Sequence, residues 1–192
     1  MEALLVSTGI VALAEIGDKT QLLALVLAAR YRRPLPIIAG ILCATVLNHA
    51  MAGLLGRLLV GVISPAALRY GLAASFVGMA VWILIPDTLD EDETLAKGRS
   101  GVFVTTLVAF FLAEMGDKTQ VATIALAARY PSVLMVVCGT TVGMLLANVP
   151  AVLVGDRLAH RLPVRLVHAV AAGIFAVLGI LLLMSPAADL GH

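Results

Sequence analysis

The sequence predicts an all-α integral membrane protein with six transmembrane helices, arranged as two inverted three-helix repeats. Hydrophobic residues fill 61% of the 192 positions, and the mean hydropathy is +1.05. Charged residues reach only 13%, whereas a soluble domain carries about 25%. Too few charges remain to cover a water-facing surface, so the chain belongs in a membrane. A polar heptapeptide that recurs 99 positions later predicts the two halves.

Six apolar stretches are each long enough for a membrane helix, which needs about 20 residues. The predicted spans are 3–29, 34–58, 66–86, 101–128, 132–155 and 164–184. They give a first three-helix repeat over 1–86, an acidic cytoplasmic linker over 87–100 and a second three-helix repeat over 101–192. The linker carries a run of Asp and Glu, but it lacks the glycine and the closing glutamate of an EF-hand loop.

The repeat is visible in the residues themselves. An offset of 99 places "EIGDKTQ" (15–21) on "EMGDKTQ" (114–120). Over 13–31 and its counterpart, 13 of 19 positions are identical. A shared apolar composition cannot produce a shared polar heptapeptide, so we interpret the two halves as a duplication.

Each predicted half has three spans, an odd number, so the second half must enter the membrane in the opposite sense. This is the inverted repeat of many secondary transporters, whose binding site lies near the midplane where the halves meet. The loops indicate the orientation, because Lys and Arg are enriched on the cytoplasmic side. Eight basic residues fall on one side and three on the other: Arg30, Arg32, Arg33, Lys97, Arg99, Arg157, Arg161 and Arg165 against Arg57, Arg69 and Arg129. The count predicts a cytoplasmic central loop and both termini outside.

The two motifs place charges at membrane depth, where one Asp or Lys costs about 2.5–3.5 kcal/mol on insertion scales. Such residues are tolerated when they face one another or water. On a helix, Glu15 shares a face with Asp18 and could pair with Lys19. The glycine of each motif, Gly17 or Gly116, would let another backbone approach or let the helix open and expose carbonyl groups.

Oxygen donors dominate the motifs, and neither motif contains His or Cys. The candidate metal ligands are Glu15, Asp18, Gln21, Glu114, Asp117 and Gln120, with Lys19, Thr20, Lys118 and Thr119 in supporting positions. Oxygen ligands suit Ca²⁺, Mg²⁺ or Mn²⁺, whereas Zn²⁺ and Cu⁺ favour imidazole or thiolate. Four acids and two lysines sum to −2, the charge that one divalent cation neutralises. Without the cation the carboxylates repel one another and attract protons, which predicts cation/proton exchange.

Three further polar residues lie in the second and fifth spans. Asn48 and Asn148 are supporting candidates, and each is read equally well as a ligand or gate and as a hydrogen-bonding partner between helices. The offset of 99 places His49 on Asn148. His49 fits a proton relay, although a single histidine in a membrane helix is more often a packing partner.

The doubled Glu-x-Gly-Asp-Lys-Thr motif, "EIGDKT" and "EMGDKT", resembles that of the Gdt-one family of cation/proton antiporters. That family spans bacterial manganese exporters and eukaryotic Golgi and chloroplast members, and the resemblance covers essentially the whole chain. It implies that Glu15, Asp18, Glu114 and Asp117 bind the cation, and that Mn²⁺ or Ca²⁺ moves against H⁺. The compact single chain is similar to the bacterial branch, which implies Mn²⁺ export across the inner membrane.

Other interpretations of the motifs remain at this point. The motif charges could be structural ion pairs, but pairing Glu with Lys within each motif would leave both aspartates over. A Ca²⁺/H⁺ exchanger uses the same ligands, and a divalent cation channel could use the same acidic ring. An intramembrane aspartyl protease also pairs two aspartates, but the added Glu and Lys of each motif would disturb a shared proton.

The sequence therefore predicts a transporter rather than an enzyme, with no cofactor and with Mn²⁺ or Ca²⁺ as cargo and H⁺ as counter-ion. Its partners are the divalent cation and membrane lipid. The net charge of +1 excludes a basic nucleic-acid surface. A homo-oligomer is compatible with the sequence but unsupported by it.

Overall fold

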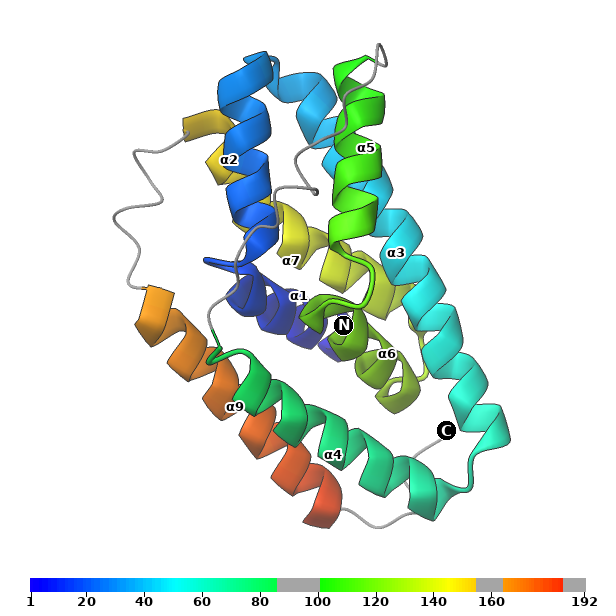
Figure 1. The fold of residues 1–192 in the computed structure, drawn as a ribbon. Coiled ribbons are helices and arrows are strands. Elements are labelled where there is room, and N and C mark those ends of the chain that lie inside the picture. Colours follow the sequence, from blue (N-terminus) through cyan, green and yellow to red (C-terminus); the bar gives the residue numbers. More distant parts are fainter. Residues whose placement is uncertain (86–100, 155–163, 185–192) are drawn as a thin grey trace.

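The computed structural model describes residues 1–85, 101–154 and 164–184, and this part of the chain is helical (Figure 1). The predicted acidic linker over 87–100 lies outside the described residues. The helices are α1 (Glu2–Glu15), α2 (Lys19–Tyr31), α3 (Pro34–Val62), α4 (Pro65–Trp82), α5 (Val102–Ala113), α6 (Lys118–Arg129), α7 (Val133–Val154) and α9 (Val164–Met184).

Local sequence explains where several helices begin. Pro34 and Pro65 stand in the first turns of α3 and α4, where the missing N–H of proline costs nothing. The Ser64 hydroxyl accepts a hydrogen bond from the Ala67 N–H at 3.4 Å and caps α4. Proline and cap together separate α3 from α4 in a tight corner.

The first and fourth predicted spans are each broken into two helices. The α1–α2 break follows Glu15 and the α5–α6 break follows Ala113. At the breaks Gly17 has φ +84° and Gly116 has φ +78°. Only glycine adopts this left-handed conformation without strain. Continuous helices over 3–29 and 101–128 are therefore wrong, and the alternative of an opened turn is right.

By length and composition, three helices of the described chain are suited to cross a membrane: Pro34–Val62, Val133–Leu153 and Arg165–Met184. The shorter Val102–Ala113 is also apolar. The broken spans yield pieces of 12 to 14 residues, about 20 Å long at 1.5 Å per residue. Each piece is shorter than the apolar core of a bilayer, about 30 Å, so only the two pieces of a span together could cross it.

The two broken spans run past each other in opposite directions. In Figure 1 α2 and α5 lie in the upper part of the molecule, whereas α1 and α6 lie below them. Helix α7 packs against α1 and α2, and α3 packs against α5 and α6. The breaks of the two spans thus meet near the middle of the bundle.

Close helix packing recurs at positions related by the offset of 99. A methyl group added at Gly139 on α7 would lie 2.9 Å from Ser7 Cβ on α1. A methyl group added at Gly40 on α3 would lie 2.7 Å from Thr106 Cβ on α5. Gly40 and Gly139 are 99 residues apart, and so are Ser7 and Thr106. Both contacts need glycine because the helix backbones approach so closely.

The third helix of each half packs against its own counterpart. Helices α4 and α9 lie side by side (Figure 1), and the rings of Phe76 and Phe175 are 6.1 Å apart. These residues are also 99 positions apart. Two equivalent residues can touch each other only near an axis that relates the halves.

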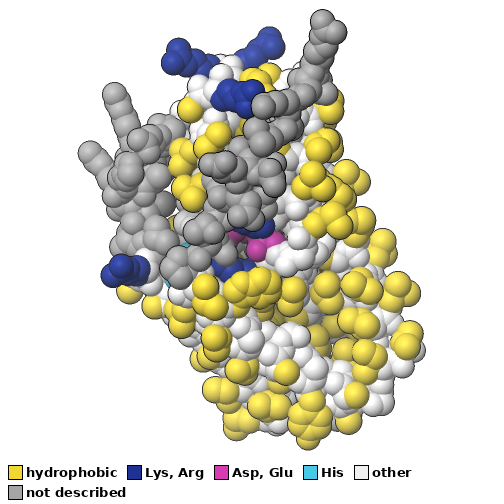
Figure 2. Space-filling model, viewed as in Figure 1, with side chains coloured by type: hydrophobic (Ala, Val, Ile, Leu, Met, Phe, Trp, Pro, Cys, Tyr) yellow, Lys and Arg dark blue, Asp and Glu magenta, His cyan; other side chains and the backbone are white. Residues whose placement is uncertain are grey.

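Hydrophobic side chains also cover the outside of the bundle. Leu54 and Leu58 on α3 and Leu153 on α7 are more than half exposed. Figure 2 shows many hydrophobic side chains over the lower part of one face, and acidic side chains near its middle. So much exposed apolar surface fits a lipid environment rather than water.

Candidate functional site

Three carboxylates from both halves meet where the helices break. Oxygen atoms of Glu15, Glu114 and Asp117 lie within 4.8 Å of one another, and all three residues are buried. Glu15 ends α1, Glu114 follows α5, and Asp117 precedes α6. Glu15 and Glu114 are 99 residues apart and, like Phe76 and Phe175, lie next to each other. Carboxylate oxygens gathered in this way are ligands for a divalent cation.

Each motif builds the same turn around its glutamate. Thr20 Oγ1 donates to Glu15 Oε2 at 2.6 Å, and Thr119 Oγ1 donates to Glu114 Oε2 at 2.8 Å. The N–H of Gly17 donates to Gln21 Oε1 at 2.9 Å. The same bond joins Gly116 to Gln120 at 2.8 Å. Threonine and glutamine therefore satisfy the polar groups that the helix break leaves open.

The helix ends at the breaks also contribute to the electrostatic potential around the three carboxylates. The carboxyl ends of α1 and α5 and the amino ends of α2 and α6 meet there. Amino ends of helices carry partial positive charge and stabilise nearby carboxylates, whereas carbonyl groups at the other ends attract cations. Broken helices at transporter sites place these two kinds of end in the same way.

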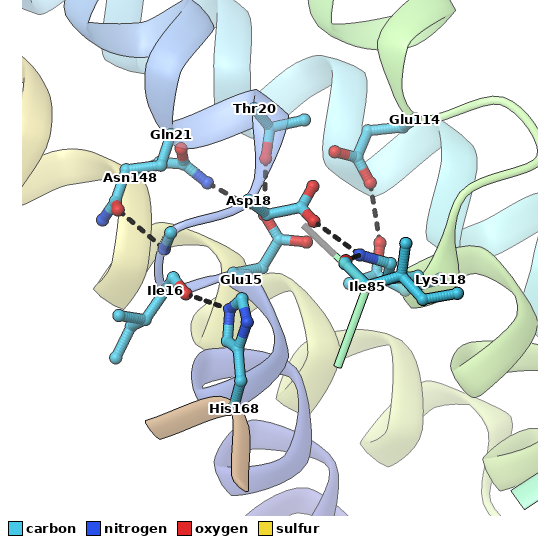
Figure 3. A network of polar contacts seen from close by, with 12 residues as sticks. Glu15, Ile16, Asp18, Thr20, Gln21, Ile85, Glu114, Lys118, Asn148 and His168 are labelled. Carbon is cyan, nitrogen blue, oxygen red and sulfur yellow. Dashed lines mark hydrogen bonds and ion pairs between the residues drawn. The ribbon is translucent and has the colours of Figure 1, made fainter. Parts of the chain in front are cut away.

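The fourth predicted acid is held by a lysine of the other half. Lys118 Nζ lies 3.4 Å from Asp18 Oδ1, and both side chains are almost completely buried. Lys118 also lies 3.5 Å from the backbone oxygen of Ile85, just after α4 (Figure 3). Asp18 is not part of the three-carboxylate group. This ion pair joins the two motifs. The sequence indicated only pairs of Glu and Lys within one motif and did not predict it.

The two asparagines make different contacts. Asn148 Nδ2 lies 3.4 Å from Glu15 Oε2 and 3.2 Å from the backbone oxygen of Met144. Asn148 therefore contacts the three-carboxylate group through the side chain of Glu15. Asn48 Nδ2 donates instead to the backbone oxygen of Phe111 at 3.1 Å, a hydrogen bond between α3 and α5.

The glutamines and Lys19 stand beside the cluster. The side-chain oxygen of each glutamine accepts a hydrogen bond from the glycine of its own motif, and Gln21 Nε2 donates to the Ala147 carbonyl at 3.0 Å. The glutamine side chains therefore hold their turns in place. Their oxygen atoms are directed at the glycine N–H groups rather than at a cation. Lys19 is only half-buried, in contrast to Lys118.

Sequence reasoning missed His168 on α9. Its Nε2 lies 2.6 Å from the backbone oxygen of Ile16, inside the first break (Figure 3). His168 thus ties α9 to the motif turn. The offset of 99 places Arg69 at its equivalent, so no repeated residue type pointed to it. Only the packing of α9 against α1 makes the contact evident.

Buried carboxylates at paired helix breaks, inside an apolar bundle, are typical of membrane transporters of cations. The family description "Divalent cation/proton antiporter GDT1" matches residues 3–91 and again residues 102–189. The chain therefore belongs to the GDT1 family of divalent cation/proton antiporters. Each half of the chain is matched separately, as a duplication would require.

Two relatives extend this finding. A putative manganese exporter of Vibrio cholerae is 52% identical over 181 residues, which cover 94% of this chain and 90% of the relative. GDT1-like protein 5 of Arabidopsis thaliana is 31% identical over 211 residues, which cover 91% of this chain and 92% of the relative. No solved structure matches the chain.

Proposed function

We propose that this chain exports Mn²⁺ from the cytoplasm in exchange for protons, and that the cation binds between the two motifs. The observation that carries the proposal is the buried group of Glu15, Glu114 and Asp117, whose oxygen atoms lie within 4.8 Å of one another. Similarity to the Vibrio cholerae putative manganese exporter favours Mn²⁺ as the cargo. The bacterial relative also favours the inner membrane as the location.

Electrostatics supports exchange rather than simple binding. Two unit charges 4 Å apart repel by about 4 kcal/mol at an effective dielectric constant of 20. Three carboxylates in one buried group therefore need a cation or protons to remain together. Glu15 Oε1 is buried and accepts no hydrogen bond among the described residues, so this oxygen is available to either ligand. Metal and protons then compete for the same oxygens, which couples their movements.

In the proposed cycle, Lys118 and Asp18 link the halves in one state. Their ion pair crosses the interface between the motifs. A cation that draws Asp18 into its ligand set would weaken this pair, because Asp18 cannot serve both partners equally. The four carboxylates of the motifs then surround the ion, while Thr20, Gln21, Thr119 and Gln120 hold the turns. Protons from outside release the cation and re-form the starting arrangement.

Alternating access would come from rocking of two inverted repeats, 1–86 and 101–192, joined by a cytoplasmic linker over 87–100. Support comes from the contacts that recur at an offset of 99, Gly139 with Ser7 and Gly40 with Thr106. The opposite courses of the two broken spans are also what an inverted repeat requires. Six spans, with both termini outside, complete the proposed topology.

Proteoliposomes containing a pH dye provide the test. Mn²⁺ added on one side of wild-type protein should move protons the other way, and Asp117→Asn should abolish the signal. Glu2→Gln serves as the matched control, because Glu2 is an exposed acid outside the cluster. Full exchange by Asp117→Asn would refute the site. Mn²⁺ entry without a pH change would show a channel, and exchange of Ca²⁺ in place of Mn²⁺ would show a calcium exchanger.

A further inference from the structure

His49 on α3 is a buried histidine outside the three-carboxylate group. Its side chain is 0% exposed. Neither Nδ1 nor Nε2 has a hydrogen-bond partner among the described residues. A buried polar group without a partner loses its hydrogen bonds to water and gains none in return. A ligand that supplied the missing partner would offset this loss.

The repeated contacts locate His49 relative to the motifs. Its equivalent at an offset of 99 is Asn148, whose side chain reaches Glu15. The packing of α3 on α5 repeats that of α7 on α1, as the glycine contacts of Gly40 and Gly139 show. By this equivalence we expect His49 to face Glu114 as Asn148 faces Glu15, although His49 is not part of the group whose ligand atoms lie within 4.8 Å of one another.

A direct contact of the neighbouring residue agrees with this placement. The hydrogen bond from Asn48 Nδ2 to the Phe111 oxygen fixes α3 alongside the last turn of α5. Phe111 precedes Glu114 by three residues. His49 follows Asn48 on the buried side of α3, one turn from Gly53, which packs against α6 and α7. His49 is therefore buried on the helix that packs against α5 and α6, the two helices of the second break.

We infer that His49 gives the transported cation an imidazole nitrogen on the Glu114 side and so selects a transition-metal ion over Ca²⁺ and Mg²⁺. This inference rests on the proposed function, because it assumes that the cation binds among the motif carboxylates. Ca²⁺ and Mg²⁺ take oxygen ligands. Imidazole is a ligand of first-row transition metals. A set of carboxylates with one imidazole accepts Mn²⁺ and disfavours an ion that binds oxygen alone.

The first test uses wild-type protein and needs no mutation. Mn²⁺ bound to the purified protein should show ¹⁴N hyperfine coupling in pulsed electron paramagnetic resonance. Labelling the histidines with ¹⁵N should replace that coupling with a ¹⁵N signal. Bound Mn²⁺ without any nitrogen coupling would overturn the inference. The proposed function would be unaffected, because its own test is loss of exchange in Asp117→Asn.

The second test asks which histidine is the ligand. His49→Asn gives the second half the residue that the first half has at Asn148. It should remove the nitrogen coupling and lower the Mn²⁺-to-Ca²⁺ transport ratio by about tenfold or more. His192→Asn is the matched control, because it removes a histidine of the same chain that lies outside the predicted spans and motifs. Coupling or a selectivity ratio that persists in His49→Asn, or is lost in His192→Asn, would overturn the assignment.

Discussion

The two motif regions have nearly the same sequence and the same turn, but different surroundings. Around the first motif, Asn148 reaches Glu15, Ala147 accepts from Gln21, and His168 bonds the Ile16 carbonyl. In the second motif, Met115 is 55% exposed and Gly116 is also exposed. The first break is thus held by hydrogen bonds to α7 and α9, whereas residues at the tip of the second break are exposed.

This difference separates what local sequence determines from what tertiary packing determines. The positive φ of each glycine, the threonine–glutamate bond and the glutamine–glycine bond occur in both halves because the residues that make them are repeated. The partners outside the motifs are not repeated, since His168 is equivalent to Arg69 and Asn148 to His49. A duplicated site can therefore keep a symmetric ligand set and still hold its two halves with unequal strength.

We expect the largest difference in stability between the halves when the two motif lysines, Lys118 and Lys19, are replaced. Lys118→Met leaves Asp18 in the interior without its ion-pair partner, and breaking a buried pair costs about 3–5 kcal/mol. Lys19→Met should cost clearly less, because Lys19 is only half-buried and water can compensate for part of the loss. Thermal unfolding of both variants in the same detergent measures the difference. Equal losses for the two lysines would show that the asymmetry has no energetic consequence.

The double variant Lys118→Met with Asp18→Asn sharpens that result. Removing both charges should restore part of the stability, because the Asp18 charge that lost its Lys118 partner is then removed as well. Exchange activity should remain low, since Asp18 belongs to the proposed ligand set. Stability that falls further in the double variant would contradict a direct pairing of these two residues.

The sequence predicted an all-helical fold and the family, and both are confirmed for the described residues. The duplication and the ligand set of the site stay predictions. These predictions follow from hydropathy and from two heptapeptides that are identical at six of their seven positions. The sequence did not decide whether the helices break at Gly17 and Gly116. A glycine in an apolar run is equally compatible with close helix packing and with an opened turn. Sequence reasoning also missed the Lys118–Asp18 pair and the His168 contact. Both join residues more than 90 positions apart, and no spacing rule reaches across such a distance.

The two glycines should respond alike and thus test the shared turn. An alanine in the left-handed conformation costs about 1–2 kcal/mol, and Gly17 and Gly116 have nearly the same φ. Gly116→Ala has open space around the added methyl group, so its cost should come from the backbone alone. Thermal unfolding of Gly17→Ala and Gly116→Ala should therefore give similar losses. A neutral Gly116→Ala would mean that the second break can form without its left-handed residue.

The smallest expected difference concerns the tyrosines that end the repeated segments, Tyr31 and Tyr130. Tyr130 Oη donates to Glu2 Oε1 at 3.2 Å, whereas the offset of 99 gives Glu2 no acidic equivalent, because Gly101 stands there. Partial burial and then the Glu2 charge raise the pKa of Tyr130 above its ordinary value of 10.0. The phenol therefore stays protonated and keeps donating at neutral pH, and its contribution is lost only as the pH rises through that raised pKa.

Tyr130→Phe should consequently lower stability by about 1 kcal/mol or less, because the bond is solvent-exposed. Tyr31→Phe is the matched control, since both tyrosines lie under the guanidinium of the preceding arginine. Glu2→Gln should reproduce much of the Tyr130→Phe loss, and the two changes together should add little. Additive losses in that double-mutant cycle would show that Tyr130 and Glu2 stabilise the end of the second repeat independently. The difference between the repeats would then have to arise elsewhere, in the packing of α9 and α7 on the first motif.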